Sequence, residues 1–393
     1  MPVADRLRPF GTTIFAEITA RALETGSVNL GQGMPDFDGP DWIKDAAGRA
    51  MGEHPNQYAP LAGVPPLRAA IAERWAQDTG FEIDDAAEVT VTAGATGCLA
   101  AASLGMLNPG DEVVVFEPFY DAYPADLGLA GAGPRFVPLR RQADGSFRFD
   151  PAELRAAVTG RTRAILLNTP HNPTGKVFER EELEQIAAVA RDRDLVVISD
   201  EVYDRLVFEG EHIPIATLDG MRERTITIGS FGKTFSLTGW KIGWAIACPE
   251  LTRAVRAAHQ FLNYAVATPL QHAVAEAIAR LDEAVPPLVA ELQARRNQLA
   301  PALRGMGMTF ADPASGYFIL ADFSDIAREL GWEAPDDVRF CHHLIDNAGV
   351  ATIPPTSFYR DKSLGANLIR IAFCKNEKTI RDAVGRLQSV RPA

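Results

Sequence analysis

Cysteine and histidine are scarce in this chain, and neither residue type shows a recognised metal or redox spacing. The 4 cysteines among 393 residues are scattered, without a Cys-x-x-Cys pair: Cys98, Cys248, Cys341 and Cys374. The 7 histidines show no His-Glu-x-x-His pattern, and the adjacent His342 and His343 point to different sides of a helix. We therefore expect reduced thiols, a cytoplasmic protein and no metal site.

Long apolar runs and positive charge are also lacking. No stretch reaches the ~18 apolar residues that a membrane-spanning helix needs, and residues Met1–Arg6 do not show the start of a signal peptide. The formal net charge of -12 argues against nucleic acids and anionic membranes as partners. Small molecules are therefore the expected ligands.

What the chain does contain indicates a large α/β fold. Hydrophobic residues make up 47% of its 393 residues, which is enough for one large domain or two lobes. From residue 87 onward β-rich runs alternate with helical patterns, and Leu195–Ser199 is nearly all apolar, as is typical of a central parallel strand. The C-terminal part lacks this alternation, which predicts a smaller α+β domain.

The segment Ser230–Trp244 is the most informative about chemistry. It follows a short β-rich run and contains two lysines, two serines and three glycines. A nucleotide-binding P-loop is poorly supported, because that motif requires a glycine where Thr227 stands. Lys233 fits better as an amine nucleophile that holds an aldehyde cofactor as a Schiff base, with Ser230 and Lys241 on either side of the cofactor's phosphate. A solvated loop lysine is the alternative, and the flanking Trp, Phe and Ile residues argue against it.

A second feature directed at a phosphate lies earlier in the chain. A β-rich run leads into the small-residue turn Ala93–Gly97 and then into a helix predicted over Cys98–Leu107. Free N–H groups and the helix dipole can hold a phosphate at such a junction. We therefore predict phosphate contacts from Gly94, Ala95 and Thr96.

Polar side chains follow two further predicted strands. The loop Asn168–Gly175 contains two prolines, which stiffen it and can aim the Asn172 amide at a ligand. Asp200 ends the most apolar strand, and Tyr203 follows it closely. A carboxylate at that position lies where α/β sheets bind their ligands, although a helix cap is the alternative for Asp200 alone.

Arg370 stands inside the apolar strand Leu368–Phe373. A buried charge is costly unless it is paired, and a guanidinium fits a carboxylate with two parallel hydrogen bonds. The partner is either a ligand carboxylate or an Asp or Glu of the protein, and the sequence leaves both alternatives open.

The lysine segment, the loop at 170–175 and the Asp200/Tyr203 pair resemble class I aminotransferases of fold type I, which depend on pyridoxal 5'-phosphate (PLP). The most similar subgroup includes kynurenine/glutamine and methionine aminotransferases, and some bacterial succinyl-diaminopimelate aminotransferases are also similar. The motifs follow the family order from about residue 28 to residue 375. Two positions differ from many members. Lys241 stands where arginine is common, and the kynurenine/glutamine-type subgroup is similar to this chain in having lysine there. Gly97 stands where many members carry glutamate.

The resemblance implies a role for each predicted residue. Lys233 would hold PLP and act as the general base, and Asp200 would face the protonated ring nitrogen. Asn172 and Tyr203 would bind the phenolic oxygen, and Tyr120 would stack on the pyridine ring. The phosphate contacts would come from Gly94, Ala95, Thr96, Ser230 and Lys241.

The resemblance also implies a substrate site and a partner subunit. Gly33, through its backbone amide, and Asn172 and Arg370 would bind the α-carboxylate of the substrate. Tyr58 would reach the cofactor phosphate of the other subunit in a homodimer. The implied domains are an N-terminal arm with part of the small domain (1–45), a large PLP-binding domain (46–289) and a small C-terminal domain (290–393).

The implied reaction is a ping-pong transamination, in which an L-amino acid donates its amino group and a 2-oxo acid receives it. One strong carboxylate-binding arginine, together with aromatic residues such as Tyr120, Tyr317 and Phe318, favours neutral or aromatic donors such as methionine, glutamine, phenylalanine or kynurenine. The alternatives are a C–S β-lyase on the same fold, a succinyl-diaminopimelate aminotransferase, a P-loop enzyme and a PLP-fold regulator.

Overall fold

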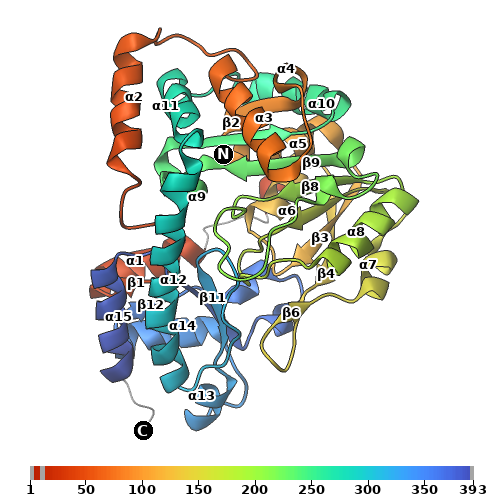
Figure 1. Ribbon diagram of the computed structural model, residues 1–393. Helices are drawn as coiled ribbons and strands as arrows, with labels where there is room; N and C mark the ends of the chain where they lie inside the picture. The colour runs from red at the N-terminus through yellow and green to blue at the C-terminus, as the bar shows by residue number, and fades with distance from the viewer. Residues whose placement is uncertain (1–3, 9–13, 390–393) are drawn as a thin grey trace.

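The computed structural model describes residues 4–8 and 14–389, and it consists of two layered parts connected by the long helix α12 (Leu281–Gly305) (Figure 1). The upper part contains a seven-stranded sheet in the order β2-β10-β9-β8-β7-β3-β4. Strand β10 (Ile242–Ile246) is antiparallel to both neighbours, and all other pairs in this sheet are parallel. The remaining strands of the sheet are β2 (Val89–Ala93), β3 (Glu112–Glu117), β4 (Gly133–Pro138), β7 (Thr162–Asn168), β8 (Val196–Asp200) and β9 (Thr225–Ser230).

Helices cover both faces of this sheet. They include α3 (Pro65–Thr79), α5 (Gly94–Met106), α6 (Ala122–Leu129), α7 (Pro151–Ala157), α8 (Arg180–Asp192) and α10 (Pro249–Leu262). Ile165 and Val197 belong to the core that contains α8, whereas their neighbours Leu166 and Ile198 belong to the core that contains α5. Because both faces are buried, the central strands are apolar at nearly every position, as the sequence predicted.

The lower part brings the two ends of the chain together. Strand β1 (Val28–Asn29) pairs with β12 (Val350–Ala351), and β11 (Phe318–Asp322) pairs with β13 (Leu368–Ala372). They pack in one core with helices α1 (Ile14–Thr25), α14 (Asp337–Ala348) and α15 (Glu377–Ser389), and α13 (Ser324–Glu329) lies nearby. The expected fold class, a mostly parallel sheet with a smaller α+β part, is confirmed.

Two further helices lie beside the upper part, at the upper left of Figure 1. Helix α2 (Asp41–Glu53) packs on α11 (Thr268–Ile278). None of the helices in the described part of the chain is long and apolar enough to cross a membrane. Parts of the predicted segments 1–45 and 290–393, namely residues 1–3, 9–13 and 390–393, lie outside the described residues.

One local expectation was wrong. Helix α5 begins at Gly94 rather than at Cys98, so the small residues form its first turn instead of a loop before it. Gly94 has φ +68°, a conformation that glycine adopts without strain. The chain can therefore pass from β2 directly into the helix, and the first N–H groups of α5 lie at the sheet edge.

The carboxyl ends of the central strands lie side by side. Asn168 at the end of β7 pairs with Asp200 at the end of β8, and Asp200 pairs with Ile228 of β9. Strand β9 ends at Ser230, and the short helix α9 (Phe231–Thr234) follows at once. This edge of the sheet therefore collects residues that are distant in the sequence.

Candidate active site

A cavity of ≈ 430 Å³ opens at this sheet edge, which is within the range of roughly 300–1,000 Å³ that is typical of small-molecule sites. It is lined from both parts of the molecule. Every predicted site residue except Tyr58 lines it: Gly33, Gly94, Ala95, Thr96, Tyr120, Asn172, Asp200, Tyr203, Ser230, Lys233, Lys241 and Arg370. The structure thus brings together residues that the sequence places more than 300 positions apart.

Lys233 projects from α9 into the cavity and is held by Tyr317. Its Nζ donates to the Tyr317 hydroxyl at 2.8 Å, and that hydroxyl donates to the Gly33 carbonyl at 3.1 Å. Burial lowers the pKa of Lys233, while the nearby Cys374 thiol and Asp200 act in the opposite direction. A lowered pKa leaves a larger fraction of the amine unprotonated near neutral pH, and only the unprotonated amine acts as a nucleophile or base. The sequence had suggested Tyr317 only as a lining residue, and its bond to Lys233 was missed.

Asp200 is buried at the end of β8, with 4% of its surface exposed. Tyr123 donates its hydroxyl to Oδ2 at 2.6 Å, and the Val202 N–H donates to Oδ1 at 3.3 Å. Burial raises the pKa of Asp200 to about 6, although Tyr123, Val202 and Lys233 lower it. A positively charged group in the cavity would offset this burial penalty. The bond from Tyr123 was not predicted, because nothing in the sequence places that residue beside β8.

The N-terminus of α5 forms a cradle suited to an anion. No side chain caps this helix, so its first N–H groups face the cavity together with Ser230 and Lys241. A Cβ on Gly94 would lie 3.3 Å from the Lys241 Nζ, which shows how close that ammonium is. A Cβ on Gly243 would lie 2.5 Å from the Gly94 carbonyl carbon. Glycine is therefore required there for β10 to approach the helix end.

Arg370 lines the same cavity and is 4% exposed. Its Nη2 donates to the Gly31 carbonyl at 3.0 Å, and its Nη1 donates to Asn172 Oδ1 at 3.5 Å. Nε has no hydrogen-bond partner in residues 4–8 and 14–389. Burial lowers the pKa of Arg370 to about 10. None of the ion pairs between described residues involves Arg370, so the predicted alternative of an ion pair within the protein is not found there.

Aromatic rings surround this guanidinium. Its central carbon lies 4.3 Å from the ring centroid of Phe318, 4.9 Å from Phe358 and 5.0 Å from Phe15. Rings at these distances attract a cation and exclude water from it. A carboxylate that enters the cavity could therefore bind the positively charged Arg370 guanidinium, which the rings have already partly desolvated. The contribution of Phe15 was missed, because it comes from a helix near the other end of the chain.

A hydrogen-bonded frame positions the loop after β7. The Asn168 side chain donates to the carbonyls of Asp200, at 2.8 Å, and Pro170, at 3.2 Å, and it accepts the Asn172 N–H at 2.8 Å. This frame fixes the Asn172 amide next to Arg370. Asn168 was not predicted as important, although its place at a strand end in the same loop was an available signal.

Two tyrosines, Tyr120 and Tyr203, also line the cavity. Tyr120 has its ring centroid 5.6 Å from that of Tyr123, edge to face, and burial raises the pKa of Tyr120 to about 12. Tyr203 is 4% exposed and packs edge to face on Tyr317 at 5.2 Å. Both side chains therefore stay protonated near neutral pH and can stack or donate hydrogen bonds.

Tyr58 is the predicted site residue that does not line this cavity. It is 86% exposed, and its ring centroid lies 5.7 Å from that of Tyr264. Its predicted role requires another subunit.

The donor set fits PLP at each of its polar ends. The α5 cradle suits the phosphate, the buried Asp200 suits a cationic ring nitrogen, and Lys233 is placed between them. A fold with this sheet order and this site defines the class of PLP-dependent transferases of fold type I.

Comparison with known proteins identifies the family. The family model described as "Aminotransferase class I and II" matches residues 25–387, and the chain belongs to this family. It is a PLP-dependent aminotransferase, whose substrates are amino acids and oxo acids. The P-loop alternative, which Thr227 already disfavoured, does not agree with this family.

Similar proteins of this family differ in their named substrates. The chain is 46% identical to the "Probable N-succinyldiaminopimelate aminotransferase DapC" of Mycobacterium tuberculosis, over 99% of each chain. A solved structure of N-succinyldiaminopimelate aminotransferase from that organism has a TM-score of 0.93, at 46% identity and with 99% of this chain and 100% of the other covered. Kynurenine–oxoglutarate transaminase 3 of Mus musculus is 39% identical, over 96% of this chain and 88% of its own. An Escherichia coli protein with a methionine aminotransferase function has a TM-score of 0.93 at 35% identity, with 99% of this chain and 100% of the other covered.

Proposed function

We propose that this aminotransferase takes its amino group from a neutral or aromatic L-amino acid, such as methionine, glutamine, phenylalanine or kynurenine. The observation that carries this proposal is the set of charges in the cavity. Arg370 is the only guanidinium among the described residues that line it, and its surroundings are the rings of Phe15 and Phe318. A second carboxylate on the donor would lie against aromatic side chains. It would lose its hydration without gaining a positively charged partner, which is unfavourable.

We propose roles for the lining residues that follow from their positions. When bound, PLP supplies an electron sink for the bond broken at the substrate Cα. Lys233 holds the cofactor and then moves the proton from the Cα, because its amine lines the cavity and burial lowers its pKa. Asp200 keeps the ring nitrogen protonated, Asn172 and Tyr203 bind the phenolic oxygen, and Tyr120 stacks on the ring.

The remaining contacts concern the two anionic groups. Gly94, Ala95, Thr96, Ser230 and Lys241 bind the phosphate. Gly33, Asn172 and Arg370 bind the substrate α-carboxylate. The Gly31 carbonyl and Asn172 both accept hydrogen bonds from Arg370, so groups of the protein itself orient the guanidinium for a carboxylate. Such preorganisation reduces the entropy that binding would otherwise cost.

We also propose a cytoplasmic homodimer with domains close to the predicted ones. Exposed aromatic side chains on one region support a subunit interface, since Tyr58 and Phe261 are 86% and 85% exposed and Tyr264 is 46% exposed. Residue 45 lies inside α2, which packs on α11. We therefore place the start of the large domain at Asp41, and its end at residue 289, where α12 continues into the lower part.

The alternative donor is N-succinyl-diaminopimelate, which the 46% identity to the Mycobacterium tuberculosis protein favours. Its distal carboxylates would need a cation from the partner subunit or from a side chain that moves. A C–S β-lyase on the same fold is a further alternative, because the same proton abstraction can lead to loss of a group from Cβ instead of amino transfer.

The test is a half-reaction followed by absorbance. The purified holoenzyme is mixed with one donor at a time and no oxo acid, using methionine, glutamine, phenylalanine, kynurenine, aspartate and N-succinyl-diaminopimelate. Conversion of the cofactor band by neutral and aromatic donors, and its reversal by a 2-oxo acid, would support the proposal. Conversion by N-succinyl-diaminopimelate alone would establish that alternative. A persistent band with release of pyruvate and ammonia from a cysteine conjugate would establish the lyase.

A further inference from the structure

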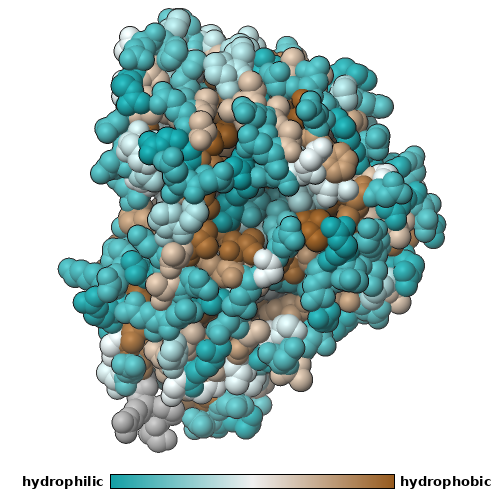
Figure 2. Space-filling view, in the orientation of Figure 1, coloured by the Kyte–Doolittle hydropathy of each residue, from teal (hydrophilic) through white to brown (hydrophobic). Residues whose placement is uncertain are grey.

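A second cavity, of ≈ 350 Å³, lies on the other face of the main sheet. Trp244 and Ile246 of β10 line it, whereas the alternate residues of that strand, Gly243 and Ala245, pack on the side of α5. Helix α3 contributes Arg74, Trp75 and Asp78. The space-filling view shows that this face of the molecule is hollowed near its centre, with hydrophobic surface inside a hydrophilic rim (Figure 2). Among the described residues, no lining residue is shared with the active-site cavity.

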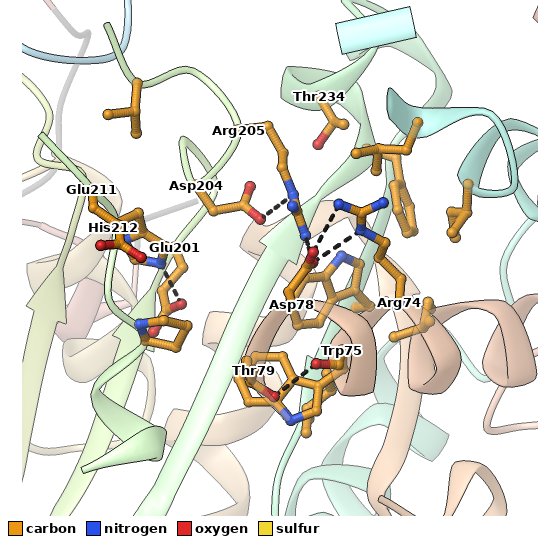
Figure 3. A pocket seen from close by; sticks show the side chains of 18 of the residues that line it. Arg74, Trp75, Asp78, Thr79, Glu201, Asp204, Arg205, Glu211, His212 and Thr234 are labelled. Carbon is orange, nitrogen blue, oxygen red and sulfur yellow. Dashed lines mark hydrogen bonds and ion pairs between the residues drawn. The ribbon is translucent and has the colours of Figure 1, made fainter. Parts of the chain in front are cut away.

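The guanidiniums in this cavity are already neutralised. Arg74 and Arg205 converge on the carboxylate of Asp78, and Arg205 also bonds Asp204 (Figure 3). The Arg74–Asp78 contact is 2.7 Å, and the Arg205–Asp204 contact is 2.9 Å. Arg74 also pairs with Asp282 at 2.7 Å. These cations are therefore poor partners for an incoming anion.

Negative charge is left over on the opposite wall. Glu201 accepts bonds from Ser199 at 2.7 Å and from His212 at 2.8 Å, and Glu211 lies beside this pair (Figure 3). The His212 side chain is 8% exposed, and its Nδ1 has no partner within the described ranges. Two arginines thus face four carboxylates around the cavity: Asp78, Glu201, Asp204 and Glu211. The lining therefore carries more carboxylates than guanidiniums, and its net charge is negative.

Aromatic side chains form the rest of the wall. Trp75, Phe208, Phe231 and Trp244 all line the cavity. Trp244 lies so close to β9 that a Cβ on Gly229 would be 2.2 Å from its ring, which fixes the position of that indole. Rigid aromatic walls beside excess negative charge are the surroundings in which organic cations bind well.

We propose that this cavity is a second small-molecule site, and that it binds an organic cation with an aromatic body. The cationic group lies toward Glu211 and Glu201, and the aromatic body lies against Trp75 and Trp244. His212 Nδ1 is available to a polar group of the ligand. An anion of the same shape is disfavoured, because the arginines that could bind it are held by Asp78 and Asp204.

The cavity adjoins the active site through two elements. Phe231 and Thr234 line it from α9, on which Lys233 faces the active-site cavity, and Glu201 follows Asp200 in the chain. A ligand in the second cavity therefore contacts the residues that flank the cofactor-binding lysine and carboxylate. If this ligand changes the affinity of the enzyme for the amino acid, the amino acid must change the affinity for the ligand by the same factor.

The test is calorimetric titration of the holoenzyme with phenethyltrimethylammonium. This probe has no primary amine, so it cannot react with the cofactor or serve as an amino donor. We expect saturable binding of one probe per chain, and binding at least about tenfold weaker for the anion 3-phenylpropanoate. Excess phenylalanine, which occupies the active site under the proposed function, is expected not to displace the probe.

Variants on the exposed rim keep the test independent of folding. Glu211→Gln should weaken probe binding about threefold, and Glu211→Lys about tenfold or more. Glu181→Gln, an exposed carboxylate on α8, is the matched control and should leave binding unchanged. Four outcomes would each overturn the proposal. The first two are a lack of saturation at millimolar probe and equal binding of the anion. The other two are displacement of the probe by phenylalanine and unchanged binding in Glu211→Lys. Because the probe is not a substrate, only the phenylalanine competition rests on the proposed function, and the other outcomes are independent of which donor the enzyme uses.

Discussion

At the scale of single residues, the two buried charges Asp200 and Arg370 of the active-site cavity are hydrogen-bonded to neutral groups. Asp200 has a tyrosine hydroxyl and one backbone N–H, and Arg370 has a carbonyl and an amide oxygen. Neutral partners of this kind orient a charged group but compensate only part of its desolvation. Under the proposed function, the PLP ring nitrogen supplies the charge opposite Asp200 and the substrate carboxylate supplies the charge opposite Arg370.

Replacing Arg370 tests the carboxylate site. Arg370→Ala should lower kcat/KM for phenylalanine about 10²-fold, mainly through KM, because two charge-assisted hydrogen bonds are lost. Activity on phenethylamine, which has no carboxylate, should change much less. The control is Arg381→Ala, an exposed arginine of α15. Equal losses on both donors would mean that Arg370 acts only as part of the structure.

Asp200 should make the stability of the cofactor-free protein depend on pH. Its pKa is about 6 in the folded protein and ~3.9 in an unfolded chain, so the folded state binds the proton more tightly. The burial penalty is therefore present above pH ~6 and disappears as the pH falls toward ~4, with a size of at most about 3 kcal/mol.

Urea unfolding of the cofactor-free protein measures this effect. Asp200→Asn should be more stable than the wild type at pH 7, and the difference should shrink at pH 5. Asp192→Asn, an exposed carboxylate of α8, should show no such change. A difference that is the same at both pH values would contradict the assignment.

At the scale of secondary-structure elements, close backbone contacts shape the phosphate cradle. Strand β10 runs antiparallel between β2 and β9, which places Gly243 directly under the first turn of α5. Because the nearest atoms are backbone atoms of Gly94 and Ala95, they cannot move aside as a flexible side chain would. The geometry of the cradle thus depends on two elements that are far apart in the sequence.

Gly243→Ala should therefore push β10 and α5 apart. We expect a loss of about 1–3 kcal/mol in the free energy of unfolding, and PLP affinity lowered about tenfold or more as the N–H groups shift. Gly133→Ala is the control, because a Cβ there meets nothing within 4 Å. Thermal unfolding and PLP titration measure the two effects. Unchanged cofactor affinity in a stably folded Gly243→Ala protein would show that the cradle tolerates the displacement.

At the scale of the whole molecule, the proposed dimer determines where Tyr58 acts. Tyr58→Phe should lower PLP affinity about tenfold, because one charge-assisted hydrogen bond to the phosphate is lost. Lys233→Ala should abolish amino transfer. A mixed dimer with one chain of each variant distinguishes a role within the subunit from a role across the interface.

In that mixed dimer, a Tyr58 that crosses the interface leaves one complete site. Half of the sites should then bind PLP as tightly as the wild type and convert a donor normally. If Tyr58 served its own subunit, the chain with an intact Lys233 would keep the weaker affinity. Light scattering of the purified protein gives the subunit number, and a monomer would remove the basis of this prediction.

The sequence by itself determined the class of fold and most of the active site. Apolar strands with polar residues at their ends predict both a buried parallel sheet and the edge at which it binds ligands, because these properties depend on local patterns. Lys233, Asp200, Asn172 and Arg370 were predicted from local motifs and from the family resemblance, and the structure brings all four to one cavity. The start of α5 at Gly94 was missed. A run of small residues that includes glycine is typical of a turn, and the sequence does not show that this run forms the first turn of the helix.

Only the tertiary structure decided which groups contact these residues. Tyr317 holds Lys233, Tyr123 bonds Asp200, and Phe15 covers Arg370, although each partner lies far away in the chain. The second cavity has the same origin, since α3, β10 and the segment after β8 form it together. Periodicity and motifs report on neighbours along the chain, whereas contacts across the core depend on how the elements pack.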